Sequence, residues 1–557
     1  MIPKKYILFI FIFFCSVYYR LSSQSYIPTQ LQSFGNSLND QMCGSDLDQE
    51  GNIYMTGFFY DQIIFGKDTL KSFGSSDIFI AKINSSGEVE WAKRAGGSSE
   101  DVGKGICVTS SAVYIVGTFG DFATFSSPIN YFENQLYSQG NKDLFIAKYL
   151  KNGKFLWVKR AGGSENDEGL GISVFGNHLM VTGSFRRFAN FNDVPDPTTN
   201  FIQSTGETDI FYAHYDTLGN YREVNSSGSL YTDNGISICA FDQYFYTTGT
   251  FRDTFLLDPQ SENTISLISK GGDDIFIAKF NYNGNCIWAK SLGGPGNETV
   301  SEIKKLADGV VITGSFSQFA EYDGISQESH GGDDFFLLHL DDFGSLRWCL
   351  HGGGDYQDYA KSVAVTPAQI LLTGNFSGEM ILTDINQTEH QLVSKGVDDI
   401  FILCSDLRGN ILWCKQEGGS SMDRAVSILK TEQTIYCLGY FSGKTHFDNG
   451  TDEGLVQTSN GSADIFISKY DPETKENDIP TIQVFPIPSE NQVNIIVDVK
   501  HIGSIYNIYD ITGKKLQTGK IYMESIIIDL TDLTSGVYIF SIVGEEGKTA
   551  RIVKSKK

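Results

Sequence analysis

Residues 271–290 read GGDDIFIAKFNYNGNCIWAK, and this stretch describes a complete β-hairpin. Its DIFIAK segment alternates and is rich in β-branched and aromatic residues, a pattern typical of a strand. Asn283 and Gly284 follow, and both residue types tolerate the positive φ of a tight turn. CIWAK then returns as a second strand. The stretch therefore predicts a hairpin, and the rest of the chain repeats it.

The hairpin recurs seven times, at intervals of about 65 residues. Its anchor aspartate, two residues before a Phe, stands at Asp77, Asp143, Asp209, Asp274, Asp334, Asp399 and Asp464. A Trp follows five of these anchors by fourteen residues, at Trp91, Trp157, Trp288, Trp348 and Trp413. Glu223 takes the Trp place in the third repeat. Repeats of this length, made only of strands and turns, are typical of propeller blades.

The repeat combines Gly-Gly-x-x-x-Asp, Thr-Gly-Ser-Phe, Gly-Gly-Asp-Asp-Ile-Phe-Ile-Ala-Lys and Asn-Gly-x-x-x-Trp. It resembles the SBBP-like repeats of seven-bladed β-propellers in secreted bacterial proteins, over roughly residues 35–470. The resemblance implies an all-β fold, with the propeller over residues 24–471. It leaves the function open, because propellers host enzymes, lectins and scaffolds alike.

The seventh repeat lacks the last strand of its hairpin, and the N-terminal segment is in register with the missing piece. Asp40 matches Asp101, so Gln30 matches Trp91. We therefore predict that residues 26–34 supply the outer strand of the seventh blade. Closing the ring in this way would leave no sheet edge open to pairing with another chain.

The N-terminus has the pattern of a signal peptide over residues 1–23. Lys4 and Lys5 precede an apolar run of about 14 residues, which is too short to span a bilayer comfortably. We expect cleavage, with no transmembrane segment afterwards, and export of the protein. The net charge of −24, without a basic run, disfavours binding to nucleic acid or anionic lipid.

The repeats stop at residues 472–481, PETKENDIPT, which predict a linker. Residues 482–557 carry Asp-x-x-Gly-Lys, Leu-x-x-Gly-x-Tyr and a basic end. This combination resembles the type A C-terminal sorting domain of type IX secretion substrates, with Pro-Ile-Pro where that family has Pro-Asn-Pro. The resemblance implies a small Ig-like β-sandwich that the type IX secretion machinery recognises. It also implies a protein that a Gram-negative bacterium secretes or holds on its outer surface. The alternative is an ordinary Ig-like accessory domain.

One set of acidic residues stands before the first strand of each repeat. Its members are Asp40, Asp101, Asp167, Asp233, Glu298, Asp358 and Asp423. In a propeller that strand borders the central channel, so the seven carboxylates could form a ring that binds a metal ion, and hard oxygen ligands suit calcium. Alternatively, each carboxylate accepts hydrogen bonds from its own turn. No other cofactor is expected.

Catalytic motifs such as His-Glu-x-x-His and Gly-x-Ser-x-Gly are absent from the sequence. We therefore predict a non-enzymatic binding or scaffold module with an unknown extracellular protein or glycan ligand. The alternative is an extracellular hydrolase or lyase acting on polysaccharide, built on loops that break the repeat, such as the one near Glu223. Cys404 and Cys414 flank one hairpin turn, and either a disulfide or two buried thiols would suit them.

Overall fold

The computed structural model describes residues 25–125, 134–192, 201–257, 264–448, 454–473, 482–486, 488–497, 501–523, 525–543 and 549–555. The signal peptide and most of the linker expected from the sequence lie outside these residues. The chain divides into two compact units, Met1–Pro472 and Glu473–Lys557. The regular elements described in both are strands, and within the described part no helix has the length and apolar character to cross a membrane.

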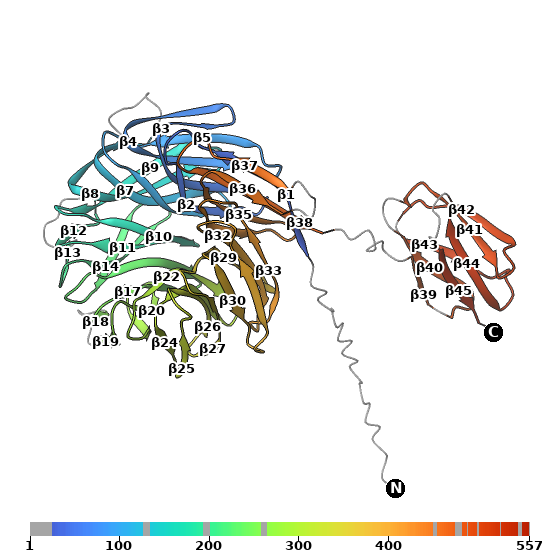
Figure 1. The fold of residues 1–557 in the computed structure, drawn as a ribbon. Helices are drawn as coiled ribbons and strands as arrows, with labels where there is room; N and C mark the ends of the chain where they lie inside the picture. Colours follow the sequence, from blue (N-terminus) through green and yellow to red (C-terminus); the bar gives the residue numbers. More distant parts are fainter. Residues whose placement is uncertain are drawn as a thin grey trace, which may run out of the picture. The chain divides into compact units, whose positions relative to one another are not determined.

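The first unit is a seven-bladed β-propeller, and each blade contains four antiparallel strands (Figure 1). Blade 1 contains β2 (Gln41–Leu47), β3 (Ile53–Phe65), β4 (Asp68–Ile83) and β5 (Val89–Ala95). Blade 2 contains β6 (Val102–Val108), β7 (Ala112–Thr124), β8 (Gln135–Leu150) and β9 (Phe155–Gly163). Blade 3 contains β10 (Glu168–Phe175), β11 (His178–Phe185), β14 (Asp209–Asp216) and β15 (Tyr221–Ser227). Blade 4 contains β16 (Asn234–Phe241), β17 (Tyr244–Phe251), β20 (Asp274–Asn281) and β21 (Cys286–Leu292).

The remaining blades follow the same order. Blade 5 contains β22 (Glu298–Leu306), β23 (Gly309–Phe316), β26 (Asp334–Asp341) and β27 (Leu346–Gly353). Blade 6 contains β28 (Tyr359–Val365), β29 (Gln369–Phe376), β32 (Asp399–Asp406) and β33 (Ile411–Glu417). Blade 7 contains β34 (Asp423–Lys430), β35 (Ile435–Phe441), β38 (Asp464–Pro472) and the N-terminal strand β1 (Tyr26–Phe34). The innermost strands contact one another in sequence, and β34 contacts β2, so the ring is closed.

Strand β1 confirms the predicted closure. It pairs antiparallel with β38, from Tyr26 opposite Pro472 to Phe34 opposite Ile465. The side chain of Tyr26 packs into the apolar cluster between blades 6 and 7, and that of Phe34 into the cluster between blades 7 and 1. The N-terminal strand therefore completes the blade-7 sheet and contributes to the core on both of its faces.

Five blades add a short outer hairpin between their second and third strands. These hairpins are β12 (Phe188–Asn190) with β13 (Phe201–Gln203), β18 (Thr254–Leu257) with β19 (Ile265–Ile268), β24 (Phe319–Tyr322) with β25 (Ile325–Glu328), β30 (Glu379–Thr383) with β31 (Glu389–Val393), and β36 (Lys444–Phe447) with β37 (Leu455–Thr458). Strand β12 pairs with β9 of the preceding blade, and β30 pairs with β27. The outer hairpins therefore join neighbouring blades by backbone hydrogen bonds.

In several blades a tryptophan side chain contacts a glycine turn of the next blade. The Nε1 of Trp91 donates to the carbonyl oxygen of Lys151 at 3.1 Å, and its indole lies against Gly153 in the same turn. Gly153 has a φ of 79°, and a Cβ there would stand 2.8 Å from the indole, so the position requires glycine. At the closure, Gln30 contacts Gly87 in the same way, as its register with Trp91 predicts.

The second unit is a small β-sandwich, as the sequence predicted. One sheet contains β39 (Gln483–Phe485), β40 (Gln492–Ile496) and β43 (Ser525–Asp529). The other contains β41 (Ile505–Asp510), β42 (Lys515–Lys520), β44 (Gly536–Ile542) and β45 (Thr549–Lys554). Their inner faces share one core, which includes Ile495, Ile508 and Phe540. The unit therefore has a hydrophobic core of its own.

Candidate functional site: blade junctions and the central channel

The seven acids that precede the innermost strands, here called the junction acids, are all fully buried. Asp101 shows the arrangement. Its Oδ2 accepts the backbone N–H of Gly97 at 2.7 Å, four residues earlier, and its Oδ1 accepts that of Gly120 at 3.1 Å, nineteen residues later. Asp167 and Asp233 accept N–H groups at the same two offsets. Each of these acids therefore ties two loops of its blade together.

Each junction acid also lies near a buried anchor aspartate of the preceding blade. A Cβ on Gly96 would lie within 3 Å of both the Asp77 carboxyl carbon and Oδ2 of Asp101. Gly162 stands in the same way between Asp143 and Asp167. Oδ1 of Asp77 is buried without a hydrogen-bond partner among the described residues. Two carboxyl groups thus face each other in a dry junction, where burying a second negative charge is costly.

The junction acids consequently hold their protons more tightly than exposed carboxyl groups do. Burial is the main cause, and the nearby anchor aspartate adds to it. The pKa rises to about 6 for Asp40 and Asp423, to about 7 for Asp101, Asp167 and Asp233, and to about 8 for Glu298 and Asp358. The anchors Asp77 and Asp143 also accept ion pairs from Arg94 and Arg160, each at 2.6 Å.

This geometry supports the turn-capping interpretation of the junction acids. Each acid accepts at least one backbone N–H, although one carboxyl oxygen each of Glu298, Asp358 and Asp423 is buried without a partner among the described residues. In the described ranges no three His, Cys, Asp or Glu side chains are grouped so that they could hold a metal ion. The calcium ring stays a prediction, which the Discussion returns to.

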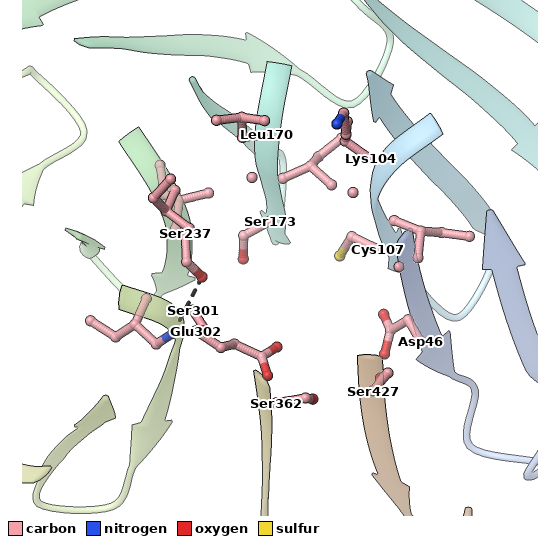
Figure 2. A pocket seen from close by; sticks show the side chains of 18 of the residues that line it. Asp46, Lys104, Cys107, Leu170, Ser173, Ser237, Ser301, Glu302, Ser362 and Ser427 are labelled. Carbon is pink, nitrogen blue, oxygen red and sulfur yellow. Dashed lines mark hydrogen bonds between the residues drawn. The ribbon is translucent and has the colours of Figure 1, made fainter. Parts of the chain in front are cut away.

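The central channel is the polar cavity of the propeller, with a volume of about 220 Å3 (Figure 2). Every blade contributes its innermost strand to the lining, and each of these strands has one β-bulge, such as that between Gly103 and Gly105. Bulges re-aim side chains. The bulged residues are Cys43, Lys104, Leu170, Ile236, Ser301, Lys361 and Val426, and all of them line the cavity.

Several charged groups of the channel have partners of their own. Glu302 forms an ion pair with Lys304 at 2.8 Å, and its Oε2 accepts the N–H of Val363 at 2.8 Å. Asp46 accepts the N–H of Val108 at 2.6 Å. Burial raises the pKa of Asp46, although the nearby Lys304 opposes this. Sequence reasoning did not single out Glu302 or Lys304, because the channel lining has no fixed residue type.

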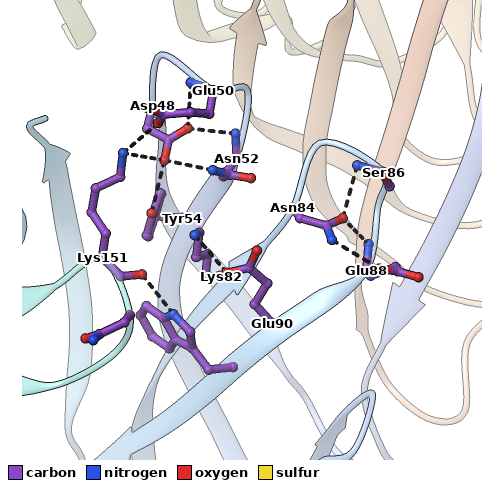
Figure 3. Close-up of polar contacts among 12 residues, drawn as sticks. Asp48, Glu50, Asn52, Tyr54, Lys82, Asn84, Ser86, Glu88, Glu90 and Lys151 are labelled. Carbon is purple, nitrogen blue, oxygen red and sulfur yellow. Dashed lines mark hydrogen bonds and ion pairs between the residues drawn. The ribbon is translucent and has the colours of Figure 1, made fainter.

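The turn after Asp46 links blade 1 to blade 2 (Figure 3). Asp48 accepts the N–H groups of Glu50 and Asn52, and Lys151 from the β8–β9 turn forms ion pairs with Asp48 at 2.8 Å and Glu50 at 2.7 Å. Burial alone would raise the pKa of Asp48, but the hydrogen bonds from Lys151 and Asn52 outweigh it and lower the pKa to about 2. This turn serves as a fastening between blades.

The third blade departs from the repeat in its side chains. Glu223, at the Trp position, lies 3.9 Å from His214, and Nδ1 of His178 lies 3.0 Å from Nε2 of His214. The His178 ring stacks on Tyr282 of blade 4 at 3.8 Å. The sequence pointed to Glu223 but missed both histidines, because they are 36 residues apart and meet only through the pairing of β11 with β14.

The sequence left either a disulfide or two buried thiols open for Cys404 and Cys414, and both residues are thiols in the structure. Cys404 stands opposite Trp413, and Cys414 stands opposite Leu403. Because side chains alternate between the two faces of a sheet, the two thiols point to opposite faces of blade 6. The eight described cysteines form no disulfide.

Known proteins resemble this chain in its two units to different degrees. An uncharacterized WD repeat-containing protein of Acanthamoeba polyphaga mimivirus is 24% identical over 418 residues, covering 60% of this chain and 29% of that protein. The chain thus spans less than a third of that relative's length. The phage phi92 endosialidase structure is 10% identical with a TM-score of 0.35, covering 95% of this chain and 80% of that one.

PorZ, a surface component of the type IX secretion system of Porphyromonas gingivalis, is 10% identical with a TM-score of 0.16, covering 94% of this chain and all of that one. Structural likenesses at these scores carry no argument about function. The sorting unit is different, since residues 483–555 match the model of the secretion system C-terminal sorting domain. The chain therefore carries a type IX secretion sorting domain and is delivered to the cell surface or the extracellular space.

Proposed function

We propose that the propeller is a non-enzymatic binding or scaffold module that acts outside the cell, with an extracellular protein or glycan as its ligand. The observation that supports this proposal is an exposed aromatic row on blades 1 and 2. It consists of Phe73 on β4, Phe122 on β7 and Tyr137 on β8. The ring centroids are 6.3 Å apart between Phe73 and Phe122, and 6.5 Å apart between Phe122 and Tyr137.

The aromatic row is accessible and has charged neighbours. Phe73 is 69% exposed and Tyr137 is 63% exposed. The guanidinium of Arg94 lies 5.8 Å from the Phe73 ring centroid. Aromatic side chains are enriched at protein interfaces, and they offer a large contact area at a small cost in conformational entropy. A row of exposed rings on adjacent blades favours recognition of an extended ligand.

The paired acids of the propeller favour binding over hydrolysis of polysaccharide. A glycosidase needs two carboxyl groups that flank the scissile bond. The junction acids and the anchor aspartates with which they pair are 0–2% exposed, so these pairs cannot reach a substrate. Their hydrogen bonds to loop backbone support a structural role for them.

The test compares the mature chain with a Phe73→Ala/Tyr137→Ala variant on protein and glycan arrays. We expect ligands of the wild type to bind at least tenfold more weakly to the double variant. Phe343→Ala is the matched control, because Phe343 is 82% exposed in the β26–β27 turn of blade 5. Equal binding by all three proteins would reject the aromatic row, and turnover of a polysaccharide without a stable complex would favour the hydrolase or lyase alternative.

A further inference from the structure

We propose that the central channel binds a small oxyanion, with Lys104 and Lys361 as its cationic groups. The proposal does not depend on the aromatic row, because the channel is lined by the innermost strands. It concerns the innermost strand of every blade, whose bulged residue lines the cavity.

The bulged residue of the innermost strand is charged in only two blades. The bulged residue is Lys104 in blade 2 and Lys361 in blade 6, whereas the other five blades have Cys, Leu, Ile, Ser or Val at this position. Within the described residues, neither lysine has a carboxylate at ion-pair distance. Lys361 Nζ lies 4.7 Å from the ring centroid of Tyr359. Part of the Lys361 residue is exposed to solvent, yet desolvation by its surroundings, and then the charge of Arg424, lower its pKa, and a bound anion would raise the pKa again.

The other charges of the channel offset these two lysines only in part. Lys304 and Glu302 neutralise each other, and Asp46 is the one further acid among the cavity-lining residues. With three lysines and two acids, the lining has a formal charge of +1 in a chain whose net charge is −24. Such a local reversal of sign concentrates anions near the ammonium groups.

Hydroxyl donors accompany the lysines. The Oγ atoms of Ser173, Ser237 and Ser362 each accept a backbone N–H from the next blade, at 2.9, 3.3 and 3.2 Å. A serine hydroxyl that accepts in this way still has its proton to donate. Figure 2 shows these three serines around the same cavity. The channel thus combines ammonium and hydroxyl donors, which suits phosphate, sulfate or a carboxylate.

The cavity is large enough for such an anion. Its volume of about 220 Å3 compares with about 30 Å3 for the share of one water molecule in the liquid. An oxyanion and a few waters fit in this space.

The experiment measures thermal unfolding and calorimetric binding of the mature chain at pH 6, in sodium phosphate or sodium sulfate against sodium chloride of equal ionic strength. We expect phosphate or sulfate to raise the melting temperature of the wild type. Lys104→Met/Lys361→Met should bind at least tenfold more weakly and lose this rise. Lys67→Met/Lys154→Met, which removes two exposed lysines outside the channel, should behave like the wild type.

The outcomes separate a channel site from general salt effects. Equal stabilisation of both double variants by phosphate, or indifference of the wild type to both anions, would overturn the proposal. Removing two uncompensated lysines should not prevent folding, and unfolding in chloride verifies this. If the double variant fails to fold, the single variant Lys361→Gln keeps the test decisive, because weaker binding of phosphate is still expected and unchanged binding would reject the site.

Discussion

At the scale of single residues, the buried carboxyl pairs predict that the propeller is stabilised by acid. The folded pKa of Asp101 is raised to about 7, whereas an unfolded aspartate has a pKa of about 4. The folded state therefore binds protons that the unfolded state has released. The stabilisation is complete below about pH 4 and is lost as the pH rises through about 7. We expect the melting temperature to fall steadily between pH 5 and pH 8.

Replacing two of the junction acids tests whether these groups cause the pH dependence of the melting temperature. Asp101→Asn/Asp167→Asn should show a smaller fall in melting temperature over that pH range, although the variant loses hydrogen bonds worth roughly 1 kcal/mol each. Glu389→Gln, at an exposed position on β31, is the control and should keep the full pH dependence. A melting temperature that rises from pH 5 to pH 8 in the wild type would contradict the assignment.

The same residues allow a test of the calcium ring. If a calcium ion binds, millimolar calcium raises the melting temperature, and Asp101→Asn/Asp233→Asn abolishes the rise. The hydrogen bonds of the junction acids lead us to expect no change with calcium or with a chelator. A calcium-dependent rise that is lost in the double variant would restore the metal site.

The individual residues that could be identified from the sequence are those that recur in every repeat. The junction acids stood out because seven repeats share them, and their role in turns followed from residue type. Their pairing with the anchor aspartates was not predictable, because Asp77 and Asp101 meet only when two blades pack. Lys104 and Lys361 were missed because a β-bulge decides which side chain faces the channel, and no turn residue marks these bulges.

At the scale of elements, strand β1 is the predicted point of weakness of the ring. Its removal would expose the edge of β38 and take Tyr26 and Phe34 out of two apolar clusters. Each aromatic truncation in a core typically costs about 3–5 kcal/mol. We expect a chain that starts at residue 40 to aggregate or to melt at least several degrees lower. Thermal unfolding followed by circular dichroism measures this change.

Point variants separate the packing of β1 from its backbone pairing. Tyr26→Ala/Phe34→Ala should lower the melting temperature while leaving the strand in place. Leu38→Ala, at a 44% exposed side chain, should leave it unchanged. An unaltered melting temperature in the chain that starts at residue 40 would show that strand β1 contributes nothing to stability.

Elements were predictable where local chemistry repeats. The hairpins formed by the third and fourth strands of a blade, such as β20 with β21, were predicted from alternating apolar residues and Asn-Gly turns. The role of β1 was predicted from its register with the repeats alone. The pairing of β12 with β9 and of β30 with β27 was not predictable. These hairpins vary in length and sequence between repeats, and their partners lie in the preceding blade, so no local pattern identifies the contact.

At the scale of the whole molecule, the sequence indicated seven blades and a separate C-terminal sandwich but no ligand. The number of blades follows from counting markers, and ring closure then places every innermost strand at the channel. Ligand recognition depends instead on side chains that differ between blades, such as Phe73 and Tyr137. Comparing the repeats identifies only the residues that they share, so the exposed aromatic row could not be predicted from the sequence.

The two-unit organisation leads to the last prediction, which concerns export. The seven blades are complete before Glu473, and the sorting unit has its own core, so each part should fold without the other. Deleting residues 473–557 should leave a folded propeller that crosses the inner membrane and stays in the periplasm. Fusing the leader and residues 473–557 to a reporter should carry it to the surface or the medium. Replacing the unit by an unrelated Ig-like domain is the control for bulk, and it should also fail to export. Cell fractionation with immunoblotting measures all three, and normal amounts of the shortened protein in the medium would show that export relies on another part of the chain.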